Sequence, residues 1–361
     1  MSKGKDRQLN MEILRVVSML MIITLHFLDK GGILKDFAEA HSLPDNLAWL
    51  IEAFCMVSVN LYVLISGYFL CKSTFKLKKS VMLWIQILLY SWIIFAVFAI
   101  VKRGSLSFEN GIYDIIPLIL PVTGNHYWFA TIYMLLYLFF PFINMGIDAM
   151  DKNMHKKACI LLLVVFSVWN TVLPFTIPVT DHEGMDICWF VVLYVIAAFI
   201  RKYPEEIKGS KFKYLAIYIA CPVLIFAFGK GLIFADSFLG KLGGYATNFY
   251  PYNSFFTAIG SIALFIFFAK SEIKAKGFVS KVILFMSAGT FGVYLIHEHR
   301  LMRYEWPKWL NTSAHSGKLT FIPYGILCIL IVFAAGIIID GLRRLIVNLF
   351  DKKPGLEEKH D

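Results

Sequence analysis

Long apolar runs separated by short polar loops recur along the whole chain. Ten of these runs have the length and the lack of charge that a membrane-spanning helix requires. They cover residues 11–28, 47–71, 81–101, 126–147, 158–177, 186–200, 213–229, 249–269, 281–299 and 321–341. A shorter apolar piece, IYDIIPLILPV at 112–122, carries Asp114 and two prolines. This piece predicts a re-entrant or interfacial segment.

The pattern predicts an all-α polytopic membrane protein with about ten transmembrane helices. Residues 1–361 are expected to form a single membrane domain, with spans over about 11–341 and a tail at 342–361. The first run is long and lacks a small-residue cleavage site, so it predicts a first transmembrane helix and not a signal peptide. The composition, 58% hydrophobic and only 17% charged, fits the same class.

The distribution of the basic residues orients the helices. With the N-terminus in the cytoplasm, 24 of the 35 Lys and Arg residues fall in inner loops and ten in outer loops, and Arg15 lies within the first run. Because inner loops are rich in Lys and Arg, both termini are predicted to be cytoplasmic. These charges contact solvent and anionic lipid in the bilayer, so the net charge of +10 requires no nucleic-acid partner.

The first run contains an arginine and a histidine eleven positions apart, in RVVSMLMIITLH at residues 15–26. Eleven residues make three helical turns plus about 20°, so Arg15 and His26 are expected on one face, about 16.5 Å apart. Ionisable groups at membrane depth cost roughly 2.5–3.5 kcal/mol and usually have a function. The structural alternative is that Arg15 pairs with Glu12 and reaches the headgroups, while His26 sits at the interface.

Three histidines are expected at one level near the outer boundary. His26 ends an outward run, His126 begins an inward run and His297 ends another outward run. Glu52 lies at a comparable depth. Imidazoles can accept a hydroxyl proton, and a neighbouring carboxylate can fix the tautomer of such a base. Glu52 is the first candidate for that carboxylate and Asp29 the second.

A metal centre is not expected, although three histidines can bind zinc. No helical HxxxH spacing occurs, and the six cysteines stand singly without a metal-binding spacing.

The inner end of the bundle has its own polar candidates. Arg15 and the stretch Ser66–Gly67–Tyr68 are expected at the cytoplasmic level, together with Lys72, Lys76, Lys78 and Lys79. Arginine binds phosphate in a bidentate manner, and Gly67 would permit close backbone approach or tight helix packing. For the four lysines, the charge rule for inner loops is a sufficient explanation.

Several stretches together resemble acyltransferase family 3 of bacterial membrane proteins. They are the Arg15–His26 spacing, VNLYVLISGYFL at 59–70, HYWFATIYMLLYLFFP at 126–141 and FGVYLIHEH at 291–299, in this order. The resemblance spans nearly the whole chain. Many members carry a Ser-Val-Glu-Glu-type motif after the tryptophan, but HYWFATIY has no carboxylate there, so no residue here matches that glutamate.

The resemblance implies a membrane-bound O-acyltransferase in a bacterial plasma membrane. The group transferred is most often acetyl, from cytoplasmic acetyl-CoA or another acyl-CoA to a hydroxyl of a cell-surface polysaccharide. The candidate donor-binding residues are Arg15, Ser66, Gly67 and Tyr68, and the candidate acceptor-binding residues are Trp128 and Tyr294. The candidate catalytic residues are Arg15, His26, Glu52, His126 and His297, with His26 acting as a general base or an acyl carrier.

The competing interpretation is a carrier or flippase for a glycan or a lipid-linked glycan. Carriers commonly contain paired broken helices and internal repeats. The sequence shows neither, and one polar stripe on the first helix favours a fixed reaction site.

Overall fold

A computed structural model of the protein describes residues 8–101, 111–124, 126–172, 179–180 and 182–351. Within these ranges the chain is helical and forms no strand. Eight helical segments are long and apolar enough to cross a membrane. The prediction of an all-α, multi-pass membrane protein is therefore confirmed.

The eight long segments include two that are interrupted. The segment Leu43–Leu70 consists of α2 (Leu43–Cys55) and α3 (Ser58–Leu70), and the segment Lys152–Val172 consists of α7 (Lys152–Leu163), a π-helical stretch (Val164–Val168) and α8 (Trp169–Val172). The other six are α1 (Leu9–Leu28), α4 (Leu77–Val101), α6 (Trp128–Asp148), α10 (Lys211–Leu239), α12 (Gly277–His297) and α14 (Phe321–Asp351).

Two of the ten predicted runs form helices shorter than a typical span. They are α9 (Ile187–Lys202), with 16 residues, and α11 (Phe255–Ala269), with 15. The start of α11 explains its length, because the Ser254 side chain accepts a hydrogen bond from the Thr257 N–H and caps the helix there. The remaining short elements are α5 (Ile112–Ile119), α13 (Glu305–Trp309) and 3-10 turns at Pro204–Glu206, Gly243–Tyr245 and Thr312–His315.

Other predicted boundaries also shift. The segment predicted at 112–122 forms α5, an eight-residue helix joined to α4 by hydrogen bonds from the Ser91 hydroxyl to Leu118 O and from the Trp92 indole to Ile119 O. The last helix continues ten residues beyond its predicted end at 341, because residues 342–351 contain no proline or glycine. Residues 173–178, within the predicted run 158–177, and residues 352–361 of the predicted tail lie outside the described ranges.

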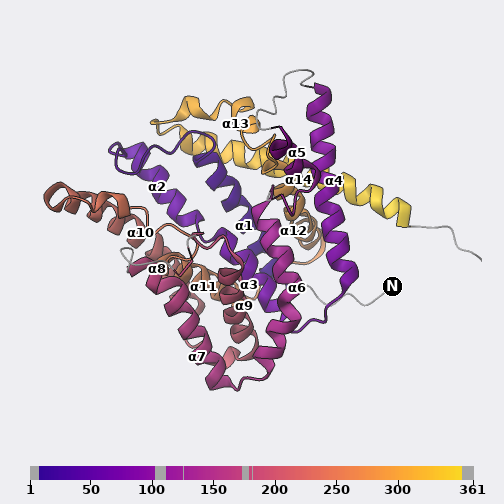
Figure 1. The fold of residues 1–361 in the computed structure, drawn as a ribbon, viewed down its shortest axis with the longest axis horizontal. Coiled ribbons are helices and arrows are strands. Elements are labelled where there is room, and N and C mark those ends of the chain that lie inside the picture. Colours follow the sequence, from indigo (N-terminus) through magenta and orange to yellow (C-terminus); the bar gives the residue numbers. More distant parts are fainter. Residues whose placement is uncertain (1–7, 102–110, 125, 173–178, 181, 352–361) are drawn as a thin grey trace, which may run out of the picture.

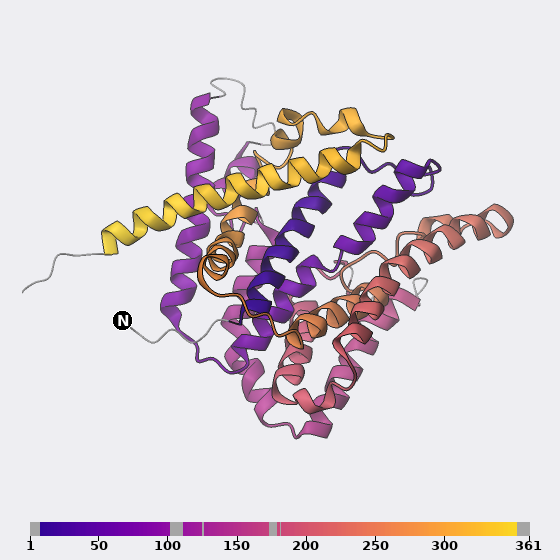
Figure 2. The ribbon, with the colours of Figure 1, turned by 180° about the vertical axis from the view of Figure 1, so that it is seen from behind.

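Helix α1 lies at the centre of the bundle, where it packs against α2, α3, α11, α12 and α14 (Figure 1). Helix α4 stands at one side, and α10 extends away on the other. Seen from behind, α14 runs obliquely across α12 and α4 (Figure 2). The central position of α1 places its polar stripe inside the protein.

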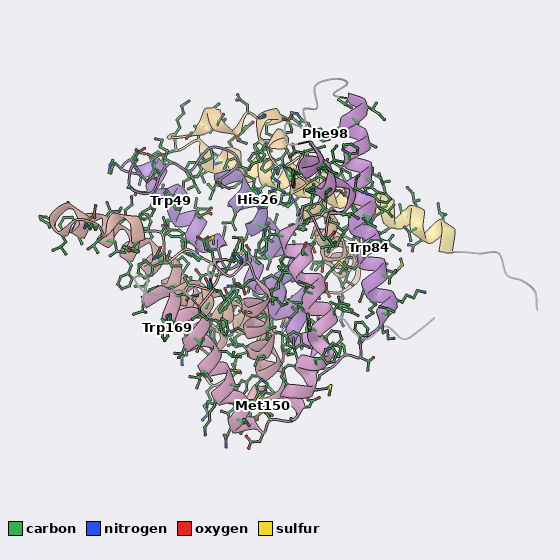
Figure 3. The ribbon with its side chains drawn as sticks, viewed as in Figure 1. His26, Trp49, Trp84, Phe98, Met150 and Trp169 are labelled. Atoms are coloured by element: carbon green, nitrogen blue, oxygen red, sulfur yellow. The ribbon has the colours of Figure 1, made fainter. Side chains whose placement is uncertain are left out.

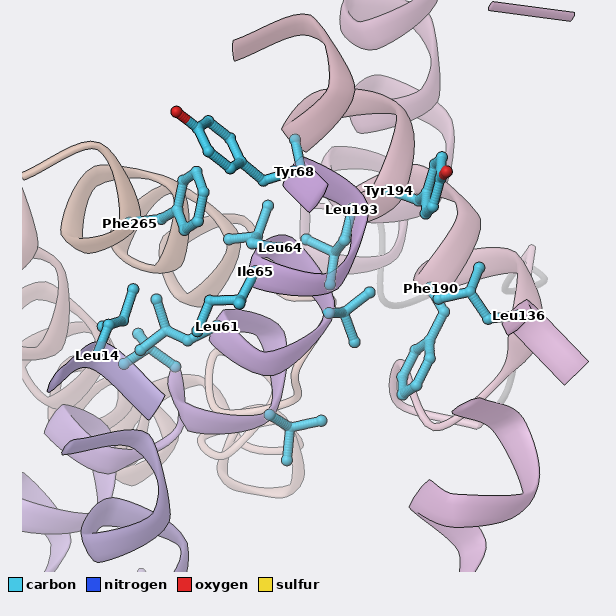
Figure 4. Packing of buried hydrophobic residues seen from close by; sticks show 14 of the residues in the cluster. Leu14, Leu61, Leu64, Ile65, Tyr68, Leu136, Phe190, Leu193, Tyr194 and Phe265 are labelled. Carbon is cyan, nitrogen blue, oxygen red and sulfur yellow. The ribbon is translucent and has the colours of Figure 1, made fainter. Parts of the chain in front are cut away.

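Helix α3 is buried over most of its circumference, and only the face with Tyr62, Ser66 and Phe69 is partly exposed. Leu61, Leu64 and Ile65 pack among Leu14 of α1, Phe265 of α11 and residues of α9 such as Leu193 (Figure 4). A helix with apolar residues on most sides belongs in a core. Gly67 sets how closely α3 approaches α9, since a Cβ added there would lie 2.9 Å from the Cα of Tyr194.

A candidate active site around His26

A narrow cavity lies beside the C-terminal half of the α1 stripe. Its internal volume is about 50 Å³, room for a few water molecules. Half of the lining residues are aromatic: Tyr62, Trp128, Phe129, Tyr252, Phe291 and Tyr294. His26 and Glu298 line it as well. Figure 3 shows His26 in the interior of the molecule, surrounded by side chains of several helices.

The cavity follows the helical stripe that the sequence predicts. Met19, Ile22 and His26 of α1 all line it, and Arg15 occupies the same stripe one turn before Met19. The hydroxyl of Tyr62, also in the wall, donates a hydrogen bond of 2.9 Å to the backbone oxygen of Arg15. The cavity therefore extends along α1 from Met19, one turn after Arg15, to His26.

The histidine pair His26–His297 has a defined hydrogen-bond pattern. His297 Nδ1 lies 2.6 Å from the backbone oxygen of Val293, which can only accept, so Nδ1 of His297 carries the proton. In a neutral His297, Nε2 is then an acceptor, and it lies 3.0 Å from Nδ1 of His26. His26 must donate from Nδ1, and its Nε2 is left as the basic nitrogen.

Glu298 binds the same nitrogen of His26 and two cations. Its Oε2 lies 3.1 Å from His26 Nδ1 and 2.6 Å from Lys30 Nζ, and its Oε1 lies 3.2 Å from a terminal nitrogen of Arg303. The Glu298 side chain is 5% exposed. Burial lowers the pKa of the Lys30 ammonium, and the adjacent Glu298 opposes this shift. One carboxylate among two cations leaves an excess of positive charge beside the cavity.

A second histidine pair, His126 and His299, lies next to the first. Their ring centroids are 4.4 Å apart, and Arg303 joins the pairs because it donates to the backbone oxygen of His126 and also binds Glu298. His126 Nε2 accepts from the backbone N–H of Arg300. Burial lowers the pKa of His126 to about 2 and that of His299 to about 3, so both are neutral near pH 7.

His26, His297 and Glu298 together present a geometry that a metal ion could use. Their ligand atoms lie within 4.8 Å of one another. Lys30 and Arg303 already form ion pairs with the Glu298 carboxylate that a metal would need as a ligand. The two histidine nitrogens, His297 Nε2 and His26 Nδ1, are already hydrogen-bonded to each other. The charges around Glu298 therefore fit a proton-handling site better than a divalent cation.

Arg15, the other end of the stripe, is held by Glu12. Its guanidinium nitrogen lies 3.0 Å from Glu12 Oε1, as the structural alternative anticipated, and its guanidinium carbon lies 5.9 Å from the ring centre of Phe69. Glu12 is buried and also accepts a hydrogen bond from the hydroxyl of Ser287. Arg15 itself stays 30% exposed, so part of its guanidinium remains accessible.

The predicted donor residues near Arg15 have structural partners. The Ser66 hydroxyl donates to the backbone oxygen of Tyr62, Gly67 packs on α9, and the Tyr68 hydroxyl accepts from Arg201. Their part in donor binding stays a prediction. Trp128 and Tyr294, the predicted acceptor residues, both line the cavity. The buried hydroxyl of Tyr294 lies against the backbone of Phe129 and Ala130 but makes no hydrogen bond of ordinary geometry with the described residues.

Glu52 lies apart from the histidine pair. No hydrogen bond between Glu52 and a histidine is found in the described part of the chain, and its Oε2 is buried without a partner. Glu298 is the carboxylate on His26, so neither Glu52 nor Asp29 holds the position expected for orienting this ring. Any other catalytic role of Glu52 stays a prediction.

Glu298, Lys30 and Arg303 are the site residues that sequence reasoning did not select. Two signals were present. Lys30 stands four positions after His26, and Glu298 is the centre of the HEH triplet at 297–299. A carboxylate between two histidines at the end of a span is a natural partner for a third histidine at the same depth.

The fold and the site define a multi-pass helical membrane protein with a buried cluster of histidines and one carboxylate. A family model described as an acyltransferase domain matches residues 8–341, which is nearly the whole chain. The chain therefore belongs to acyltransferase family 3. No curated protein and no solved structure matches it.

Proposed function

We propose that the protein is an O-acyltransferase of a bacterial plasma membrane that moves an acetyl group from acetyl-CoA to a hydroxyl of a cell-surface polysaccharide. One observation carries this proposal: His26 lines the cavity, and its contacts with His297 and Glu298 leave Nε2 as its basic nitrogen. Membership of an acyltransferase family supports the reaction class. The acetyl group and the glycan acceptor rest on the family resemblance.

The donor is proposed to enter from the cytoplasmic end. Arg15, partly exposed, would contact a phosphate of the acyl-CoA, since guanidinium groups bind phosphate in a bidentate manner. The pantetheine arm would then follow Met19 and Ile22 toward His26. This path uses the stripe on α1 and requires the N-terminus to be cytoplasmic.

The chemistry is proposed to be general-base catalysis. The acceptor hydroxyl transfers its proton to His26 Nε2 as its oxygen attacks the thioester carbonyl. When the tetrahedral intermediate collapses, the C–S bond breaks, and the CoA sulfur leaves as the thiol after taking the proton from His26. The ester forms on the acceptor, and His26 returns to its starting state.

The cations around Glu298 are proposed to assist this step. The two positive charges of Lys30 and Arg303 outweigh the single negative charge of Glu298. Negative charge develops on the thioester carbonyl oxygen as the hydroxyl attacks. A fixed positive field in a site of low dielectric constant stabilises such charge. The aromatic wall of Trp128 and Tyr252, whose rings stack at 5.9 Å, offers a flat surface for a sugar ring.

The proposal is tested with purified protein, acetyl-CoA carrying a heavy-isotope acetyl group, and cell-surface polysaccharide. Mass spectrometry should detect labelled ester on the glycan and, without glycan, slow hydrolysis of acetyl-CoA. A carrier would produce neither result, and that outcome would overturn the proposal. Arg15→Ala should weaken acetyl-CoA binding about tenfold or more, and unchanged affinity would remove Arg15 from the donor site.

A further inference from the structure

A cationic pocket lies between the start of α4 and the last turns of α14. Lys76, Lys78 and Lys79 line it together with Arg343, and no acidic side chain takes part. Its internal volume is about 530 Å³, some ten times that of the cavity at His26. The rest of its wall is apolar apart from Gln86 and consists of Met82, Leu83, Ile85, Leu89 and Val347, so the pocket combines cationic with apolar side chains.

The positive charge of this pocket is not balanced by the protein. No ion pair engages Lys76, Lys78 or Lys79 in the described part of the chain. Arg343 binds the buried Asp340, but Arg344 binds the same carboxylate, so one negative charge serves two guanidinium groups. A pocket with this excess of positive charge favours an anionic ligand.

The pocket continues into an apolar groove. Leu89 and Arg343 line both, which makes the two hollows contiguous. The groove has an internal volume of about 310 Å³ and runs beside α4 past Ile93, Val97 and Phe98, with Ile339 of α14 opposite. Helix α4 stands at one side of the bundle (Figure 1), and Ile93, Val97 and Ile339 of the groove are exposed, so the groove opens at the surface of the protein.

We propose that this pocket and groove form a specific binding site for an anionic phospholipid. The phosphate would lie against Lys76, Lys78, Lys79 and Arg343, and one acyl chain would occupy the groove along α4. The cationic pocket suits the phosphate of a lipid head group, and the apolar groove suits an acyl chain. Coenzyme A fits less well, because its ribose and adenine would lack polar partners in the groove.

The site is distinct from the candidate active site. None of the residues lining the pocket lines the cavity at His26, and the groove shares no residue with that cavity either. The lipid would fill the space between α4 and the pair α12–α14. The inference goes beyond the proposed acyl transfer and does not depend on it.

Native mass spectrometry of the full-length protein in detergent tests the head site. One phosphatidylglycerol should bind in preference to phosphatidylcholine. Lys76→Gln/Lys78→Gln/Lys79→Gln should weaken phosphatidylglycerol binding roughly 100-fold, since each lysine near an anionic lipid contributes about a fivefold factor. The matched control is Lys274→Gln/Lys276→Gln/Lys281→Gln, which removes the same charge from exposed residues at the start of α12. Its affinity should stay within about twofold of the wild type.

The groove is tested with a second matched pair of variants. Ile339→Trp fills the groove and should lower the affinity about tenfold, while Ile338→Trp, an exposed neighbour outside the groove, should not. Unchanged binding in the lysine variant, an equal loss in its control, or equal effects of the two tryptophans would each overturn the proposal. Displacement of the lipid by micromolar coenzyme A would also overturn it and assign the pocket to the donor.

Discussion

His297 fixes the hydrogen-bonding state of His26. Nε2 of His297 lies 3.0 Å from Nδ1 of His26, while Nδ1 of His297 donates to Val293 O in the preceding helical turn. The proton of His26 therefore belongs on Nδ1, where Glu298 also accepts it. The backbone carbonyl of Val293 in α12 thus fixes the tautomer of His297, and His297 in turn determines that Nε2 is the basic nitrogen of His26.

Glu298→Gln should damage both stability and activity. The amide keeps the shape of the side chain but leaves Lys30 and Arg303 buried without a counter-charge, which should lower the free energy of unfolding by about 3 kcal/mol. Transfer should fall roughly 100-fold, because the neutral amide no longer stabilises the imidazolium that His26 becomes when it accepts the proton. Thermal unfolding and acetyl transfer are the measurements.

The second variant for this prediction is Glu298→Gln/Arg303→Gln. It restores the balance of charge and should recover part of the stability but not the activity. A single Glu298→Gln variant with wild-type stability and turnover would show that this ion network is not required.

Tyr294→Phe should lower activity without lowering stability. The hydroxyl is buried in the cavity wall and makes only weak contacts with the backbone of Phe129 and Ala130, so removing it should cost little stability. A hydroxyl that binds substrate in the transition state should cost roughly 100-fold in kcat when removed. Tyr113→Phe, at an exposed tyrosine, is the control. Equal kcat values in the two variants would assign Tyr294 to packing alone.

Gly67→Ala should destabilise the contact between α3 and α9. The added methyl would lie 2.9 Å from Tyr194 Cα, and backbone atoms cannot move aside as a flexible side chain can. The expected loss is about 1–3 kcal/mol. Gly146→Ala in α6 is the matched control, because a methyl there meets nothing within 4 Å and should be neutral or slightly stabilising. Similar unfolding temperatures for the two variants would contradict this packing.

The stability of the protein should decrease as the pH falls below about 6.5. Burial lowers the folded-state pKa of His126 to about 2 and of His299 to about 3, while the unfolded chain has ordinary histidine pKa values. At a pH between the folded-state pKa and the unfolded-state pKa of a histidine, the unfolded state binds more protons than the folded state. Each of the two histidines therefore costs about 1.4 kcal/mol of stability for every unit by which the pH falls.

Thermal unfolding between pH 4 and pH 7.5 measures this dependence. His126→Gln/His299→Gln should flatten the curve, and His41→Gln, at an exposed histidine, should leave it unchanged. An identical pH dependence in the double variant and the wild type would show that these two histidines do not carry it.

The sequence predicts the helices and the depth of the site better than its contacts. Helical periodicity alone places Arg15 and His26 on one stripe, and the alternation of spans brings His126 and His297 to the level of His26. These inferences need only the rise and the rotation of a helix. The short helices α9 and α11 were harder to predict, since a cap such as Ser254 decides where α11 begins inside an apolar run.

The choice between carboxylates could not be made from depth. Glu52 and Glu298 lie near the same end of their helices, but the side of the helix that faces His26 depends on how the helices pack. Packing directs Glu298 to His26 and leaves the Glu52 Oε2 buried without a partner. The lipid site likewise depends on the oblique crossing of α14 near α4, which no local pattern predicts (Figure 2).

The most direct test of the account is acetyl transfer by His26→Ala in purified, folded protein. The variant should bind acetyl-CoA with nearly wild-type affinity, because the proposed phosphate contact is made by Arg15 and not by His26. Its unfolding temperature should fall somewhat, since His297 Nε2 and Glu298 each lose the contact with His26 Nδ1. Transfer of labelled acetyl to the glycan should fall roughly 100- to 10,000-fold, the range in rate that a catalytic base contributes. Wild-type transfer by this variant would contradict the central claim that the Nε2 of His26 accepts the proton.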